Sequence, residues 1–206
     1  CITSSLYTQN KAMNVLIDLL GSTFIGGLLM LLILKLNLYS QNASYSSDSE
    51  LKMQQNAKTL AEILDYDLRK VGYNHDSTAI IVADSNRIKF YADMNEPGTY
   101  GYGTLDVVEY FLSSPSKASA TTNPRDIVLT RVINGNDTLS GPSLGLVKLV
   151  FSYFDQKLDV STNPDSIKFI KTEFWVESLE PIEINFGTQT GYPFTYWEMT
   201  INPRNI

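Results

Sequence analysis

An uninterrupted apolar stretch near the amino end dominates the hydropathy pattern of this chain. It runs from Val15 to Leu34, with one charge, Asp18, near its start and none from Leu19 on. A helix of about 20 apolar residues spans the roughly 30 Å hydrocarbon core of a bilayer. The stretch is longer than the apolar part of a secretory signal peptide, and no small-residue cleavage site follows it. The pattern predicts a retained membrane-spanning helix over residues 14–39, after a polar extension over residues 1–13.

A second apolar pattern has the period of an amphipathic helix. Residues 40–49 are small and polar and fit a joint, a frayed helix or a short linker. From Met53 to Val71, apolar residues then recur at spacings of three and four. Gly72 follows, where a helix C-cap favours a left-handed residue. We predict a helix from about Ser49 to Val71 within segment 40–72. The pattern leaves open whether it continues the membrane helix.

Beyond Gly72, residues 73–206 alternate polar and apolar side chains as half-buried strands do. Two neighbouring runs, 79–84 and 87–93, are predicted to form a hairpin that turns at Ser85 and Asn86. Further strands are expected at 106–112, 126–133, 145–154, 166–176 and 194–201, with loops rich in Gly, Pro, Asn and Ser between them. The whole pattern predicts an α+β fold, in which a long N-terminal helix packs on an antiparallel sheet.

The composition argues against several classes of function, namely nucleic-acid binding, zinc binding and the common types of catalysis. The net charge is -6, from 16 basic and 22 acidic residues without a basic block, so nucleic acid is not an expected partner. One cysteine excludes an intrachain disulfide, and one histidine, His75, offers little for zinc binding or acid–base catalysis. The chain contains no nucleophile elbow, phosphate-binding loop or zinc-protease motif. We therefore expect a protein that is not an enzyme and needs neither a metal nor a cofactor.

The order of the elements, together with three local motifs, resembles a type IV pilin. VLIDLL (15–20) is similar to the apolar start of mature pilins, with Asp18 where that family carries an acidic residue. LAEILDYDLRKVGYN (60–74) resembles the helix end of the larger minor pilins and J-type pseudopilins, and WEMTINPRNI (197–206) resembles their carboxy-terminal ending. The resemblance covers the chain from about Asn14 on.

This resemblance implies a structural subunit of an extracellular, cell-surface filament. Such a subunit is a single-pass protein of the inner membrane before assembly, and its partners are copies of itself or other pilins. A main subunit, a minor tip subunit and a secretion-system pseudopilin all fit. The alternative from another class is a membrane-anchored binding module that never polymerises.

Asp18 is the first candidate assembly residue, because a carboxylate within an apolar span is usually paired or functional. In pilins the acidic residue at this place pairs with a neighbour's terminal amine. Here the extension moves that amine away, so Lys11 of another subunit is the candidate partner. The alternative is that Asp18 reaches water at the membrane interface.

Two pairs of small residues, Ser22 with Gly26 and Thr23 with Gly27, are further assembly candidates. Small side chains let helices approach closely, although glycine is also common in spanning helices generally.

Two clusters of charged and polar residues are weak candidates for a catalytic or metal site. Asp65, Asp67 and Arg69 near the end of the second helix are predicted to be solvated and locally paired. Asp93, Asn95 and Glu96 carry oxygen atoms of the kind calcium prefers, but their spacing matches no known calcium loop.

Cys1 supports a hypothesis of lipidation, since a cysteine at the first mature position is what a lipoprotein signal peptidase leaves; an ordinary free thiol is the alternative. If the hypothesis holds, intact-mass spectrometry of the protein from its own cells will show the added mass of a lipid. A peptide with an unmodified Cys1 would exclude it.

Overall fold

The structure is a computed structural model that describes residues 2–114, 118, 121–140, 143–184 and 189–206. Cys1 lies outside the described residues. The chain divides into two compact units, residues 1–47 and residues 48–206. Each unit is described by itself.

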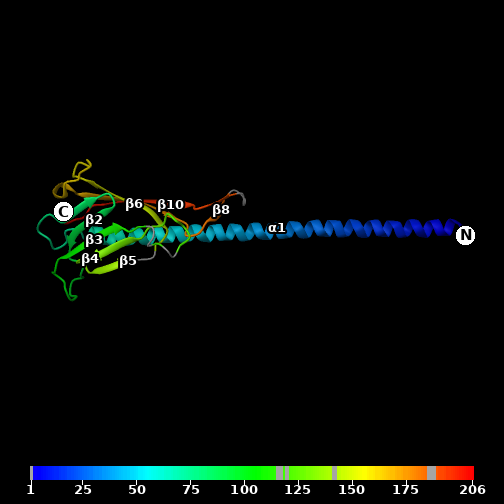
Figure 1. The fold of residues 1–206 in the computed structure, drawn as a ribbon, viewed down its shortest axis with the longest axis horizontal. Coiled ribbons are helices and arrows are strands. Elements are labelled where there is room, and N and C mark those ends of the chain that lie inside the picture. Colours follow the sequence, from blue (N-terminus) through cyan, green and yellow to red (C-terminus); the bar gives the residue numbers. More distant parts are fainter. Residues whose placement is uncertain (1, 115–117, 119–120, 141–142, 185–188) are drawn as a thin grey trace. The chain divides into compact units, whose positions relative to one another are not determined.

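One helix, α1 (Ile2–Arg69), contains both helical patterns predicted from the sequence, and residues 40–49 are helical within it (Figure 1). In the first unit, residues 13–47 are exposed along their whole length. Among the described residues, one helix, over Met13–Arg69, is long and apolar enough to cross a membrane. The sequence explains this continuity, because neither proline nor glycine interrupts residues 28–71.

The second unit contains two larger antiparallel sheets. The first is a meander in which each strand pairs with the next. Its strands, in order, are β1 (Ile80–Asp84), β2 (Arg87–Ala92), β3 (Asp106–Leu112), β4 (Leu129–Ile133) and β5 (Asp137–Ser140).

The second sheet has the order β10-β7-β6, so its central strand pairs with both others. The strands are β6 (Leu146–Phe154), β7 (Phe169–Glu177) and β10 (Phe194–Ile201). A short 3-10 helix, η2 (Pro164–Ser166), precedes β7, and β8 (Ile182–Ile184) pairs with β9 (Gln189–Gly191).

The predicted α+β class is confirmed, as are the first hairpin and the strands at 106–112 and 194–201. The strand predicted from residue 126 begins at Leu129 instead. Residues 134–143 were expected to be a loop, but β5 lies within them. The turn before it consists of Asn134, Gly135 and Asn136, and Asn134 and Gly135 have φ of 53° and 75°. Asn-Gly is a dipeptide that favours a tight hairpin. Strands β8 and β9 were not predicted.

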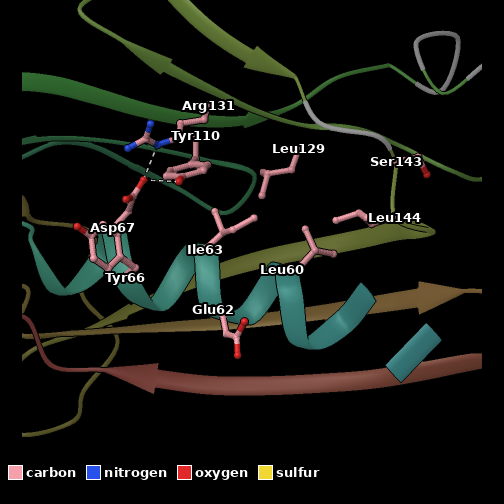
Figure 2. A pocket seen from close by; sticks show the side chains of 10 residues that line it. All are labelled: Leu60, Glu62, Ile63, Tyr66, Asp67, Tyr110, Leu129, Arg131, Ser143 and Leu144. Atoms are coloured by element: carbon pink, nitrogen blue, oxygen red, sulfur yellow. Dashed lines mark hydrogen bonds and ion pairs between the residues drawn. The ribbon is translucent and has the colours of Figure 1, made fainter. Parts of the chain in front are cut away.

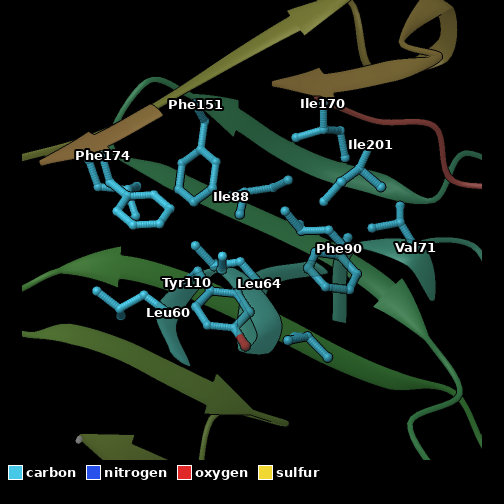
Figure 3. Packing of buried hydrophobic residues seen from close by; sticks show 14 of the residues in the cluster. Leu60, Leu64, Val71, Ile88, Phe90, Tyr110, Phe151, Ile170, Phe174 and Ile201 are labelled. Carbon is cyan, nitrogen blue, oxygen red and sulfur yellow. The ribbon is translucent and has the colours of Figure 1, made fainter. Parts of the chain in front are cut away.

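The core of the second unit lies between the helix stripe and the two sheets. Leu64, Leu68 and Val71 of α1 are completely buried. They belong to the same cluster as Phe90 and Val108 of the first sheet (Figure 3). From the second sheet the cluster includes Phe151, Ile170, Phe174 and Ile201. The apolar stripe predicted from Met53 to Val71 is therefore confirmed as core, and it contacts residues of both sheets.

Gly72 ends the helix as predicted, at φ 77°. Its N–H donates to the carbonyl of Tyr91 in β2, with N and O 2.9 Å apart. A Cβ atom at this position would lie 2.6 Å from the backbone oxygen of Asn205 and 3.1 Å from the Ala79 side chain. The glycine is thus required both by its conformation and by the close approach of the chain's carboxy-terminal residues.

We predict that Gly72→Ala lowers the midpoint of thermal unfolding. The left-handed backbone conformation costs roughly 1–2 kcal/mol for a residue with a Cβ, and the collision with Asn205 adds to that cost. Gly98→Ala is the matched control, since Gly98 has φ 86° but open space around it. Calorimetry of the full chain in detergent should show a larger loss for Gly72→Ala. Equal losses would mean that the close approach contributes nothing.

Candidate functional site

The exposed apolar surface of α1 in the first unit is the largest candidate interaction surface. Every large apolar side chain from Met13 to Tyr39 exposes at least 50% of its area. Soluble proteins rarely leave a contiguous apolar surface of this extent uncovered, and such surfaces mark membrane or protein contacts. This surface is consistent with single-pass membrane anchoring.

Asp18 is an exposed carboxylate within this surface. Within residues 13–47 no basic side chain makes an ion pair with it. Lys11 lies seven residues earlier in the same helix, about 10.5 Å along the axis at 1.5 Å per residue. Seven residues complete nearly two turns, so both positions lie on one face of α1. Lys11 and Asp18 therefore occupy positions on one face of α1 that are nearly two turns apart.

The small residues of α1 are open to approach by a second helix. The Ser22 hydroxyl donates to the Leu19 carbonyl at 2.9 Å, and the Thr23 hydroxyl contacts the carbonyls of Leu19 and Leu20 at 3.0 Å. These hydroxyls are therefore satisfied within the helix and suit apolar surroundings. No heavy atom of another segment lies within 4 Å of where a Cβ of Gly26 or Gly27 would stand.

A buried charged cluster lies in the second unit, where the sequence predicted solvated charges. Asp67 is only 3% exposed. Its carboxylate accepts a short hydrogen bond from the Tyr110 hydroxyl and one from Arg131 Nε at 2.5 Å (Figure 2). The prediction for Asp67 was therefore wrong. Asp65 and Arg69 do form the expected exposed pair, with Oδ2 and Nε 2.8 Å apart.

The spacing of residues in the sequence predicts that Asp67 is buried. Asp67 follows Leu64 by three residues and precedes Val71 by four, so it lies on the apolar stripe itself. A carboxylate on the buried face of a helix needs a charged or hydrogen-bonding partner inside the domain. The identity of that partner could not be derived, because Arg131 is 64 residues away.

A groove adjoins this cluster. Its volume is about 550 Å³, and its apolar lining comes from Leu60, Ile63 and Tyr66 of α1 together with Leu129 and Leu144 (Figure 2). Burial, and then the neighbouring Asp67, raise the pKa of Tyr110 well above its ordinary value. The tyrosine therefore stays protonated and serves as a donor. The cluster contains no nucleophile beside a base, so its chemistry is that of a structural ion pair.

The loop around Asp93 is satisfied internally. Asp93 is fully buried, and its carboxylate accepts from Asn74 Nδ2 at 2.8 Å, Gly103 N at 2.7 Å and Asn95 N at 3.1 Å. Burial alone would raise the pKa of Asp93, but these hydrogen bonds hold it below the ordinary value. In the described part of the chain, no group of three or more His, Cys, Asp or Glu residues is placed to hold a metal ion.

Comparisons with known proteins add little. No family model matches the chain. No curated protein matches it. Among solved structures, a type IV-like pilin from Thermus thermophilus is similar, with 9% identity over 74% of this chain and 96% of that chain. Its TM-score is 0.48, so the fold assignment rests on the helix and sheets described above.

We predict that Asp67→Asn destabilises the second unit by about 3 kcal/mol. This lies at the low end of the range for breaking a buried pair, because the Arg131 side chain left behind keeps 18% of its area exposed. Asp65→Asn is the control, since it breaks a solvent-exposed pair on the same helix and should change little. Urea unfolding of the full chain in detergent measures both. Equal stability of the two variants would contradict a role for the buried pair.

Proposed function

We propose that this chain is a pilin-like structural subunit of an extracellular filament. The single observation that carries the proposal is the fully exposed apolar surface of α1 in residues 13–47, on the same helix that packs into the core of the second unit. Residues 14–39 hold the chain in the inner membrane before assembly and line the filament core afterwards. Residues 73–206 form the globular domain that the filament displays.

Hydrophobicity alone does not drive this assembly, since the helix exchanges one apolar environment for another. Close packing and polar contacts between helices must therefore favour the filament. Ser22 with Gly26, and Thr23 with Gly27, supply two places where neighbouring backbones can approach. Both hydroxyls are already satisfied within α1, so the approach leaves no polar group without a partner.

Asp18 sets the register between subunits in this proposal. A carboxylate at the centre of a membrane span costs roughly 2.5–3.5 kcal/mol by insertion scales, which is an upper bound for Asp18 near the start of its span. An ion pair with Lys11 of a neighbouring subunit would remove much of that cost. Because the two positions share a face of α1 about 10.5 Å apart, subunits shifted by that distance along the axis would bring them together.

The proposal includes main subunits, minor subunits and secretion-system pseudopilins. Electron microscopy of filaments sheared from cells, with mass spectrometry of the same pellet, separates these roles. A dominant chain indicates the main subunit, and a trace component indicates a minor one. The mass of the same material reports whether Cys1 carries a lipid.

We expect Asp18→Ala to abolish filaments while the membrane-bound level of the subunit stays unchanged, because the substitution removes the register contact and leaves the span more apolar. Asp48→Ala is the matched control, an exposed carboxylate on the same helix beyond the apolar segment. Electron microscopy and immunoblotting of sheared and membrane fractions measure both effects. Normal filaments from Asp18→Ala would remove the assembly role of Asp18.

Single cysteines placed along residues 19–34 test the filament itself. Homotypic crosslinks with a helical period are expected if α1 packs against copies of itself. Absence of crosslinks under assembling conditions would favour a membrane-anchored module that does not polymerise.

A further inference from the structure

A third buried aspartate, Asp126, differs from Asp67 and Asp93 in the second unit. Asp126 lies in the segment before β4 and has no exposed surface. Its backbone N–H donates to the carbonyl of Asn123 at 3.2 Å. Neither oxygen of its carboxylate has a hydrogen-bond partner within the described part of the chain. A buried carboxylate in this condition is costly.

The surroundings of Asp126 are rich in oxygen atoms. Glu177, the last residue of β7, is only 7% exposed and lies close enough to repel the Asp126 charge. The hydroxyls of Thr121 and Ser143 also neighbour the Asp126 carboxylate. The Thr121 hydroxyl donates instead to the Ala118 carbonyl at 3.3 Å. The Ser143 oxygen accepts from the Gly145 N–H at 3.1 Å.

The positive charge nearby is already engaged. Glu177 Oε2 accepts from Arg125 Nη2 at 2.9 Å and from Asn123 Nδ2 at 2.8 Å. Lys148, which lines the same surface as Glu177, stands 4.4 Å from the centre of the Trp175 ring. Arg125 and Lys148 together balance the two carboxylates in charge, but among the described residues neither forms an ion pair with Asp126. Burial, and to a smaller extent Glu177, raise the pKa of Asp126 above its ordinary value.

The three segments that meet here are fixed by backbone contacts of their own. The Glu177 N–H donates to the Gly145 carbonyl at 2.7 Å. Gly145 has φ 75°, and a Cβ on it would stand 2.2 Å from the Glu177 carbonyl oxygen. The Ile127 N–H donates to the Leu146 carbonyl at 2.7 Å. Backbone contacts therefore hold together the three segments that carry Asp126, Ser143 and Glu177.

We propose that Asp126, Glu177 and the Ser143 hydroxyl form a binding site for a hard divalent cation of the calcium class. Calcium takes six to eight oxygen ligands, from carboxylates, carbonyls and water, and tolerates irregular geometry. Asp126 supplies two unshared oxygens and Glu177 supplies Oε1, while Arg125 keeps Oε2. With so few protein ligands, the site belongs to the weak class found in extracellular modules, with Kd of about 10⁻⁴–10⁻³ M. It stands apart from the proposed assembly role of α1.

Thermal unfolding of the full chain in detergent, in calcium and in chelator, tests the site. At calcium tenfold above Kd, the unfolding midpoint should rise by about 3–6 °C. Asp126→Asn should lose this rise. In chelator it should unfold at the same temperature as the unmodified chain or higher, because the amide removes an uncompensated buried charge. Asp93→Asn is the matched control: it loses hydrogen bonds of a satisfied buried carboxylate, so it should unfold earlier but keep the calcium rise.

Terbium luminescence excited through tryptophan gives a binding signal independent of stability, since Trp175 lies two residues before Glu177 in β7. The signal should appear in the unmodified chain and in Asp93→Asn, fall on addition of calcium, and be absent in Asp126→Asn. A calcium rise of equal size in Asp126→Asn, or none in the unmodified chain, would overturn the proposal.

Discussion

Burial of one helix stripe, from Met53 to Val71, is the constraint on which the rest of the second unit depends. Full burial of a leucine side chain contributes roughly 1.5–3 kcal/mol, and Leu64 and Leu68 are both completely buried among residues from the two sheets. No strand of the first sheet pairs with a strand of the second. The stripe is an apolar surface that both sheets can cover. The helix thus joins two small sheets into one core, and neither sheet could detach without exposing it to water.

Helix α1 has an apolar surface on all sides in the first unit and on one face only in the second unit. In residues 13–39 the apolar side chains are exposed all round, as on surfaces that contact a membrane or another protein. In residues 53–71 only one face is apolar, and that face is covered within the chain. A continuous helix links the two surfaces, because residues 40–49 carry no residue that would break it. In the proposed filament, an assembly contact formed by residues 14–39 would therefore be joined to the displayed domain by uninterrupted backbone hydrogen bonds.

Local patterns predicted most of the fold, and long-range pairing limited the rest. The helical period identified the stripe, and alternation located β3, in which buried Val108 and Tyr110 alternate with half-buried residues. Strand β10 was located from its β-branched and aromatic residues, although only Ile201 in it is buried. Strand β5 was missed because residues 134–143 are mostly turn formers, although Asn134-Gly135 itself signals a hairpin. Asp67 was misjudged because its partners, Tyr110 and Arg131, come from adjacent strands. The assembly residues of α1 followed from position alone and remain predictions.

Three buried aspartates in one unit show how differently a carboxylate can be accommodated. Asp67 has a guanidinium and a phenol, and Asp93 has two backbone N–H groups and an amide. The Asp126 carboxylate makes no hydrogen bond within the described part of the chain, yet Asp126 is as completely buried as Asp93. In our proposal, a divalent cation held by the surrounding oxygen atoms compensates an ionised Asp126 beside Glu177.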